Sequence, residues 1–330
     1  MPAAPFPFPA RRDPRTGRFV NLPPPQVHGF RDVLRWKFGF GEGFTPAVPA
    51  AEIPPYAPEY VEPDPAALAR PPADMVQLTW IGHSTWLIQV GGVNILTDPI
   101  YGRVCAPFPS LALRRRARPG VPWAQLPRID AVVISHSHYD HLDRPTVRRL
   151  GAGPHFLVPT GLGTLLRRWG AQPVHEAYWG DEVRFAGVSF RSLPARHFSA
   201  RTFWNRNVTL WCGWLVEVAG RRIYFAGDTA YGSFFPELGR HLGSIDVGLL
   251  PISAYQPRWF MREVHLDPAE AVQVHRDLRI RRSFAMHWGT FRLSDEPLGE
   301  PPVYLARARA AAGLPPEDFR VLKFGETVRV

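Results

Sequence analysis

The chain of 330 residues contains only two cysteines and no long hydrophobic run. Two cysteines exclude a disulfide-rich secreted scaffold. No segment approaches the about 18 consecutive apolar residues that a membrane-spanning helix needs. The first thirty residues hold prolines and arginines where a secretory signal peptide would have an apolar core. We therefore expect a soluble, cytoplasmic protein without a signal peptide or a transmembrane segment.

Lysine is also nearly missing, although the chain is strongly basic. Lysines and arginines together number 39 against 29 acidic residues, for a formal net charge of +10, and the only lysines are Lys37 and Lys323. Genome composition alone can produce such a skew, but arginine attracts phosphate whatever its origin. The charge is therefore compatible with an anionic substrate or an anionic lipid surface, and it establishes neither.

The distribution of proline divides the chain in two. Residues 1–72 carry 17 of the 37 prolines, and proline disrupts both helix interiors and central strands. We expect an N-terminal arm here and one globular domain over residues 73–330. Within the arm, residues 30–40 mix aromatic side chains with basic ones. This mix suits an aromatic segment packed on the domain, which we favour, or a short amphipathic element at a membrane surface.

Beyond residue 75, short strands alternate with helices. Apolar or alternating runs predict strands at residues 77–80, 86–90, 93–97, 131–134, 189–193, 210–218, 222–225 and 247–252. The pair Gly91-Gly92 predicts a hairpin. Helices are expected at residues 145–150, 161–169 and 302–312. Another begins after Asp267, where an N-cap aspartate is followed by proline and by Glu270. The pattern indicates an α/β fold with two sheets between helices.

The most specific feature of the sequence is a dense group of histidine and aspartate after the strand at 131–134. It consists of His136, His138, Asp140 and His141. Side chains two positions apart on an extended chain share a face, so His136 and His138 can point the same way. Asp140 and His141 follow the turn and can face a second ion. Imidazole and carboxylate ligands suit zinc, and they also suit iron or manganese.

Three isolated residues add to this group, each just beyond an expected strand end. They are His197, Asp228 and His287. Functional residues concentrate at such strand ends in layered α/β folds. A lone histidine is more often structural than a ligand, but the three residues together with the first group predict one metal centre.

The order H-x-H-x-D-H, a distant histidine, an aspartate in Gly-Asp-Thr and a final histidine resembles the metallo-β-lactamase superfamily. The resemblance implies a four-layer αββα sandwich that holds two Zn²⁺ ions per chain. It also implies hydrolysis by a hydroxide held between the metals. By this resemblance, one ion is bound by His136, His138 and His197, the second by Asp140, His141 and His287, and both by Asp228.

Further segments resemble one branch of that superfamily. Trp-Ile-Gly-His-Ser-Thr at residues 80–85, Leu-Thr-Asp-Pro-Ile at 96–100 and Met-His-Trp-Gly-Thr-Phe at 286–291 are similar to the N-acyl-phosphatidylethanolamine-hydrolysing phospholipase D family and its bacterial relatives. This resemblance implies a zinc phosphodiesterase that releases N-acylethanolamine and phosphatidic acid, with peripheral contact at the inner face of the membrane.

Other substrates and partners remain open at this point. The alternative is a metallo-hydrolase of a soluble phosphodiester, a sugar phosphate or a lactone, and a nucleic-acid hydrolase ranks behind these. We do not expect nucleic acid as a partner, because the sequence shows no aromatic stacking platform for bases. A second copy of the chain, in a homodimer, is a further candidate partner.

The same resemblance suggests residues around the substrate. It places His265 near the substrate phosphate and makes His265, Asp140 and Asp228 the expected catalytic residues, although packing at a helix entry is the alternative for His265. Arg258 either faces the phosphate or pins its own loop, and Tyr255 on that loop is an expected substrate contact.

Two more residues are candidates for supporting the metal ligands, and two depart from the family pattern. His83 and Asp98 either orient a metal ligand or serve a structural role. Gln256 stands where the family pattern has glutamate, and Val264 stands where it has glutamine, beside His265. These departures put the choice of substrate in doubt more than the metal chemistry.

Overall fold

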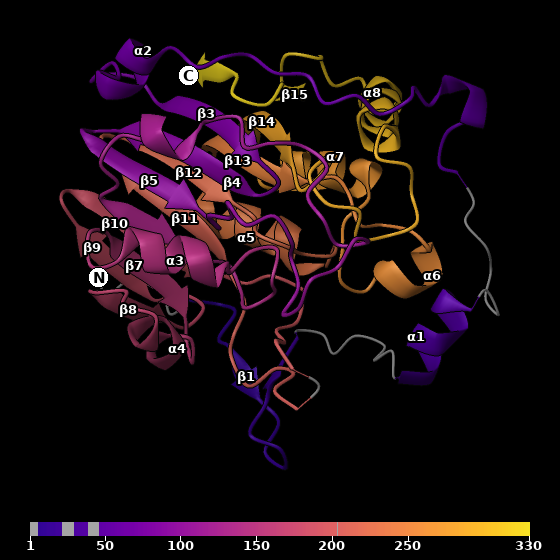
Figure 1. Cartoon of the computed structure of the whole chain (residues 1–330), viewed down its shortest axis with the longest axis horizontal. Helices are drawn as coiled ribbons and strands as arrows, with labels where there is room; N and C mark the ends of the chain where they lie inside the picture. The colour runs from indigo at the N-terminus through magenta and orange to yellow at the C-terminus, as the bar shows by residue number, and fades with distance from the viewer. Residues whose placement is uncertain (1–5, 22–29, 39–45, 203) are drawn as a thin grey trace.

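The computed structural model describes residues 6–21, 30–38, 46–202 and 204–330. Two sheets, each of seven strands within this described part, form the centre of the molecule (Figure 1). The first sheet has the order β16 (Thr327–Arg329), β3 (Gln77–Gly82), β4 (Thr85–Val90), β5 (Val93–Thr97), β6 (Ala131–Val133), β7 (His155–Pro159) and β8 (Val174–Ala177). The second has the order β15 (Phe319–Arg320), β14 (Ile280–Met286), β13 (Ile245–Pro251), β12 (Arg221–Phe225), β11 (Gly213–Val218), β10 (Val188–Leu193) and β9 (Glu182–Phe185).

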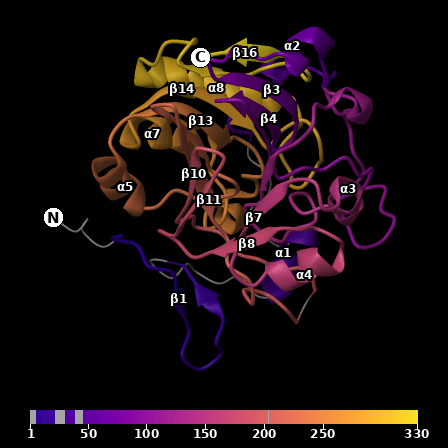
Figure 2. The same ribbon diagram turned by 90° about the vertical axis from the view of Figure 1, so that its left-hand side faces the viewer.

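Helices cover the outer faces of both sheets, and Figure 2 shows the sheets between them. The helices against the first sheet are α2 (Pro65–Ala69), α3 (Arg144–Leu150) and α4 (Gly163–Arg168), and those against the second are α5 (Phe234–Leu242), α7 (Pro268–Asp277) and α8 (Glu300–Ala312). Leu68, Val147 and Leu166 bury these contacts on the first side. The larger apolar core fills the space between the two sheets. The expected αββα sandwich is therefore confirmed.

Local sequence signals explain two of the junctions. β4 and β5 form the expected antiparallel hairpin, in which Val90 pairs with Val93, and Gly91 and Gly92 both have positive φ, as a tight hairpin turn requires. At the start of α7, Asp267 accepts a hydrogen bond from the Glu270 backbone at 2.8 Å, and the Glu270 carboxylate caps the Asp267 backbone in return. Both predictions are confirmed.

Parallel pairing determines where the candidate residues lie. β5 to β8 run parallel to one another in the first sheet, and β12 to β15 do so in the second. The carboxyl ends of parallel strands meet at one edge of a sheet. The loops that follow β5, β6, β12 and β14 therefore meet at one edge of the sandwich.

Some elements lack the pattern that predicts them. The edge strands β8 and β9 carry charged side chains among short apolar ones, so they show no hydrophobic run. Helix α5 contains a proline and a glycine. Both residues have a low helix propensity, so the sequence does not predict this helix. Strand β11 begins at Gly213, later than expected, because residues 210–212 still belong to the preceding loop.

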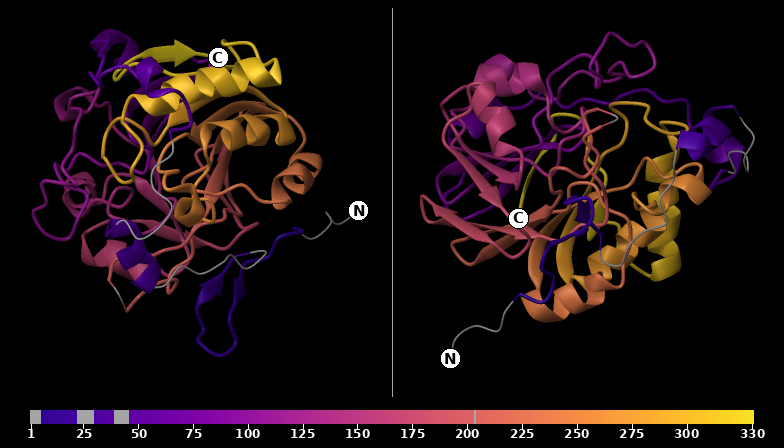
Figure 3. Two further views of the ribbon diagram at one scale, coloured as in Figure 1. Left: turned by 90° about the vertical axis from the view of Figure 1, so that its right-hand side faces the viewer. Right: turned by 90° about the horizontal axis from the view of Figure 1, so that it is seen from below.

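The N-terminal arm lies against the domain at several points. Strands β1 (Arg11–Arg12) and β2 (Phe19–Val20) form a hairpin that projects from the body in Figure 1. Helix α1 (Phe30–Lys37) lies beside α6 (Arg258–Met261), as Figures 1 and 3 both show. The ring of Trp36 lies 5.0 Å from that of Phe260, and its Nε1 donates to Asp295 at 2.6 Å.

This contact agrees with the packed interpretation of residues 30–40, but α1 also carries exposed apolar groups. Leu34 is 38% exposed and Phe38 is 69% exposed. Phe40 lies outside the described residues. Among the described helices, none combines the length and the apolar character needed to cross a membrane.

Candidate metal centre

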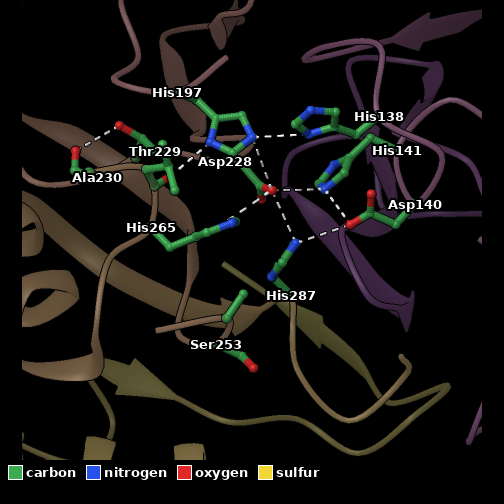
Figure 4. Close-up of polar contacts among 12 residues, drawn as sticks. His138, Asp140, His141, His197, Asp228, Thr229, Ala230, Ser253, His265 and His287 are labelled. Carbon is green, nitrogen blue, oxygen red and sulfur yellow. Dashed lines mark hydrogen bonds and ion pairs between the residues drawn. The ribbon is translucent and has the colours of Figure 1, made fainter. Parts of the chain in front are cut away.

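All seven expected metal ligands lie at the edge of the sandwich where the parallel strands end, and Figure 4 shows most of them converging on Asp228. Each follows a strand whose last residues are buried, so the core fixes the point at which each side chain leaves the sheet. His136, His138, Asp140 and His141 follow β6, His197 follows β10, Asp228 follows β12, and His287 follows β14.

The first group consists of His136, His138 and His197. Nε2 of His136 lies 2.8 Å from Nδ1 of His138, and Nε2 of His197 lies 3.2 Å from the same Nδ1. With zinc–nitrogen bonds of about 2.1 Å, the ligand atoms of a tetrahedral site lie about 3.4 Å apart. The three nitrogens therefore already have nearly the spacing that one ion requires.

The second group consists of Asp140, His141 and His287. Oδ2 of Asp140 lies 3.2 Å from Nε2 of His141 and 3.4 Å from Nε2 of His287. Both imidazoles are completely buried, whereas the Asp140 side chain is 13% exposed. The carboxylate thus lies on the side of the group that opens to solvent.

Asp228 joins the two groups. Its Oδ2 lies 3.1 Å from Nε2 of His141 and 3.1 Å from Nε2 of His287. The same oxygen lies 3.8 Å from Nε2 of His197 and 3.9 Å from Nε2 of His136. One carboxylate oxygen is therefore shared by imidazoles of both groups, which is the position of a ligand that bridges two ions.

The protonation of these side chains suits metal binding. Burial lowers the pKa of His138 to about 4 and the pKa of His197 to about 3, so both imidazoles are neutral and keep a free lone pair. Burial acts in the same direction on His287, but Asp228 and Asp140 outweigh it and raise the pKa of His287 to about 9. The two carboxylates therefore attract positive charge, which bound cations also supply.

Unsatisfied polar atoms give an independent test of the fit. Nε2 of His141 and Nε2 of His287 are buried, and neither forms a geometrically acceptable hydrogen bond within the described residues, although Asp228 lies close to both. A buried polar atom without a partner is costly. A divalent cation between the two nitrogens and the carboxylates would satisfy both, so the donors of the second group fit such an ion.

Further residues hold the ligands in place. Oδ2 of Asp98 lies 2.7 Å from Nδ1 of His141, and Oδ1 of Asp98 accepts a hydrogen bond from the Ser135 backbone at 2.7 Å. Nε2 of His83 lies 3.0 Å from Oδ2 of Asp140. Burial and the neighbouring His287 lower the pKa of His83 to about 3, so its ring is neutral and can donate to that carboxylate. Both residues therefore contact a candidate ligand.

The backbone at the centre is strained. His83, Asp98 and His287 have φ values of 53°, 34° and 64°, in the left-handed region that side chains other than glycine rarely adopt. Such conformations cost about 1–3 kcal/mol each and persist where the surroundings fix them. Here the His287 N–H donates to the His83 carbonyl at 3.0 Å, and the His83 N–H donates to Oγ1 of Thr290 at 2.8 Å, so hydrogen bonds hold two of these residues in place.

The segment Glu263-Val264-His265 closes one side of the centre. The His265 side chain is 12% exposed, and its Nδ1 lies 3.9 Å from Oδ2 of Asp228. The Val264 carbonyl lies 2.8 Å from Nδ1 of His197 and accepts its hydrogen, while Glu263 pairs with Arg196. Because the backbone of Val264 makes this contact, the departure from the family pattern at Val264 leaves the support of His197 intact.

Two expected substrate contacts, Tyr255 and Arg258, have partners within the protein. Tyr255 is completely buried and packs on Tyr304, with ring centroids 5.8 Å apart, so it offers no surface to a substrate. Arg258 pairs with Glu270 at 2.5 Å and donates to the His265 carbonyl at 3.0 Å. Of the two roles left open for Arg258, the structure therefore agrees with pinning the loop, and the expectation for Tyr255 is corrected.

The sequence assigns no role to two buried residues that support the site or the loop beside it. Glu296 is 2% exposed, and its carboxylate accepts hydrogen bonds from the Ala254 backbone at 2.6 Å, the Gln256 backbone at 3.1 Å and the Ser253 hydroxyl at 2.9 Å. Asn21, in the arm, contacts the backbone of His197. Neither residue belongs to a local motif, because their partners are distant in the sequence.

Comparisons with known proteins agree with this geometry. Residues 93–288, which include all seven candidate ligands, match the family described as the β-lactamase superfamily domain. An uncharacterised protein of Mycobacterium tuberculosis is 40% identical over 298 residues, which cover 87% of this chain and 77% of the mycobacterial protein. The N-acyl-phosphatidylethanolamine-hydrolyzing phospholipase D 1 of Caenorhabditis elegans is 39% identical over 241 residues, which cover 69% of this chain and 66% of the worm protein.

A solved structure shows the same architecture. The metallo hydrolase Igni18 from the archaeon Ignicoccus hospitalis superposes with a TM-score of 0.58 at 25% identity, and the match covers 78% of this chain and 98% of that protein. The similarity in fold therefore extends over more than three quarters of this chain.

Proposed function

Because the chain belongs to the β-lactamase superfamily and has its metallo-β-lactamase fold, we propose that this metal-dependent hydrolase is a phosphodiesterase of phospholipase D type. Its proposed substrates are phospholipids like N-acyl-phosphatidylethanolamine, cleaved to N-acylethanolamine and phosphatidic acid. The similarity to the worm phospholipase D over most of the domain supports this substrate class.

The observation that carries the proposal is the place of the Asp228 carboxylate between two groups of ligands. His136, His138 and His197 would hold one ion, Asp140, His141 and His287 would hold the other, and Asp228 would contact both. Zinc fits this set of imidazole and carboxylate donors, as do iron and manganese. When bound, such a pair of ions lowers the pKa of water and neutralises charge on a phosphoryl group.

Other residues of the chain orient the candidate ligands and the substrate. His83 orients Asp140, and Asp98 orients His141. His265 lies on the partly exposed side, where a phosphate would enter. Burial holds the pKa of His265 well below its usual range, so its neutral ring can donate a single hydrogen bond to a phosphate oxygen or to the leaving oxygen of the ethanolamine. Arg258 fixes the His265 backbone and thereby the direction of its ring.

Exposed apolar and basic groups support a substrate drawn from a lipid surface. Trp204, on the loop that follows His197, is 83% exposed. Phe38 at the end of α1 is 69% exposed. Exposed tryptophan is enriched at membrane interfaces, and an excess of arginine attracts anionic headgroups. We propose peripheral contact with a membrane through this side of the molecule.

The decisive experiment combines metal analysis with product identification. Purified protein is assayed for bound metal by elemental analysis, and the same sample is given N-acyl-phosphatidylethanolamine in mixed micelles and, separately, bis(p-nitrophenyl) phosphate. Mass spectrometry then identifies the lipid products. We expect two metal ions per chain, and we expect N-acylethanolamine and phosphatidic acid in equal amounts.

The other outcomes separate the alternatives. Turnover of the soluble diester alone would keep a metal-dependent phosphodiesterase and discard the lipid substrate. Release of a free fatty acid would show acyl hydrolysis instead of phosphodiester cleavage. Two metals with no turnover of either compound would overturn the proposed substrate class. The Asp228→Asn variant serves as the inactive control in each assay.

A further inference from the structure

The N-terminal arm reaches into the metal centre through one residue. Asn21 is 3% exposed, although it lies in the proline-rich part of the chain. Its Nδ2 donates to the backbone carbonyl of His197 at 2.7 Å, and its Oδ1 accepts from the backbone N–H of His197 at 3.1 Å. One amide side chain thus binds both polar backbone groups of a single residue.

The partners of Asn21 determine the orientation of its amide. Oδ1 also accepts from Nε1 of the buried Trp211 at 3.2 Å, and a ring N–H can only donate. With Oδ1 committed to two donors, Nδ2 must face the His197 carbonyl, which can only accept. No other uncharged side chain of this size offers a donor and an acceptor side by side in this way.

The rest of the arm segment holds Asn21 in place. The Phe19 backbone donates to the Asn207 carbonyl at 2.9 Å, and the Phe19 ring is 1% exposed. Arg18 donates to the carbonyls of Trp204, at 2.8 Å, and of Arg206. Residues 18–21 are therefore anchored to the loop that follows His197 before they reach His197 itself.

Together these contacts constrain His197 from opposite sides. The ring is held at Nδ1 by the Val264 carbonyl, at 2.8 Å, and the backbone is held by Asn21. Only Nε2 is left, and it faces Nδ1 of His138 at 3.2 Å. We infer that Asn21 is a positioning residue that fixes His197 as a ligand of the first ion, so that the N-terminal arm is part of the metal centre.

This inference rests on the proposed role of His197 as a ligand, and the test separates the two. Metal-free protein is titrated with Co²⁺ in the presence of a chromophoric chelator, which yields two stepwise affinities and a visible spectrum for each step. His197→Ala and His287→Ala identify which step belongs to which group of ligands. No substrate is needed, so the result does not depend on the substrate class.

We expect Asn21→Ala to weaken the step that His197→Ala abolishes by about 10-fold or more, the usual cost of losing a group that orients a metal ligand. The step that His287→Ala abolishes should be unchanged. A merely structural role would lower the melting temperature of the metal-free protein without changing the ratio of the two affinities. The matched control is Arg15→Ala, which alters an exposed residue of the turn between β1 and β2 and leaves the contacts of Phe19 and Asn21 in place.

A second variant covers the case in which Asn21→Ala does not fold. Asn21→Asp keeps the size and both accepted hydrogen bonds, but it replaces the bond donated to the His197 carbonyl by a carboxylate oxygen that repels this carbonyl. It should weaken the same step and shift the same Co²⁺ spectrum. If either variant binds both ions as Arg15→Ala does, Asn21 has no positioning role. If His197→Ala itself leaves both steps intact, the proposed ligand set is at fault.

Discussion

Nδ1 of His141 and Oδ2 of Asp98 lie 2.7 Å apart, and both side chains are completely buried. A carboxylate at this distance fixes the tautomer of the imidazole, because it requires the hydrogen on Nδ1 and leaves the lone pair on Nε2. Nε2 is the atom that faces Asp140 and Asp228. The pair therefore orients the His141 ring so that Nε2 is the atom that would face an ion.

Asp98→Asn should weaken metal binding. The amide can present its N–H to Nδ1 and reverse the tautomer, so one ion should bind about 10- to 100-fold more weakly. Stepwise affinities from a chelator competition would measure this. Asp130→Asn is the control, since Asp130 caps the Asn94 backbone and touches none of the candidate ligands. Equal affinities in the two variants would contradict the orienting role of Asp98.

Asp228→Asn and His138→Ala should abolish turnover while the protein stays folded. Each removes a proposed ligand, so the loss of activity should exceed the about 10- to 100-fold that follows loss of an orienting group. Elemental analysis and circular dichroism of the purified variants would accompany the assay. Full activity in either variant would rule out a mechanism that uses both ions.

His265→Ala should lower kcat and leave two ions bound. Loss of one hydrogen-bond donor aimed at developing charge costs about 10²- to 10³-fold in kcat. The readouts are steady-state kinetics on the diester that the enzyme accepts and the metal content of the same sample. Arg262→Gln, on the same loop and exposed, should resemble the wild type. Loss of an ion in His265→Ala would instead make His265 a metal ligand.

Glu296→Ala should destabilise the whole domain. The substitution leaves the backbone donors of Ala254 and Gln256 and the Ser253 hydroxyl buried without their acceptor. At about 1–3 kcal/mol for each unsatisfied group, the free energy of unfolding should fall by at least about 3 kcal/mol. Urea unfolding would measure it. Glu317→Ala, which alters an exposed carboxylate, should change it by less than about 0.5 kcal/mol.

Trp204→Ala should reduce binding to vesicles that contain anionic lipid, and it should reduce turnover of lipid more than turnover of a soluble diester. Trp204 projects from its loop and is 83% exposed, so its loss removes an interfacial anchor without opening the core. Vesicle sedimentation would compare it with Val61→Ala, which alters a residue that is 40% exposed and lies beside the C-terminal strand. Equal sedimentation of both variants would contradict membrane contact through Trp204.

The ligand-bearing strand ends could be predicted from the sequence because their signals are local. The strand at 131–134 and the histidines that follow it lie within a few residues of one another, and periodicity plus residue type is sufficient to find them. The hairpin at Gly91-Gly92 and the capping box at Asp267 are local in the same sense. Such features survive into the structure because tertiary packing reinforces them.

The supporting contacts could not be predicted in this way. Asn21 and His197 are 176 positions apart, and Glu296 reaches back 42 positions to Ala254. The burial of Tyr255 could not be predicted either, because a loop beside a site can direct an aromatic ring into the core. Contacts of this kind depend on how the sheets stack, and no pattern along the chain records that.

The pairing of β16 with β3 has a consequence for biosynthesis. Thr79 and Thr327 are 248 positions apart and share a hydrogen bond. At about 5–20 residues per second, roughly 12–50 seconds of translation separate them. During that interval the β16-facing edge of β3 has no strand to pair with, and an open edge invites association with another chain. The nascent protein should therefore depend on chaperones that shield this edge until residues 327–329 have left the ribosome.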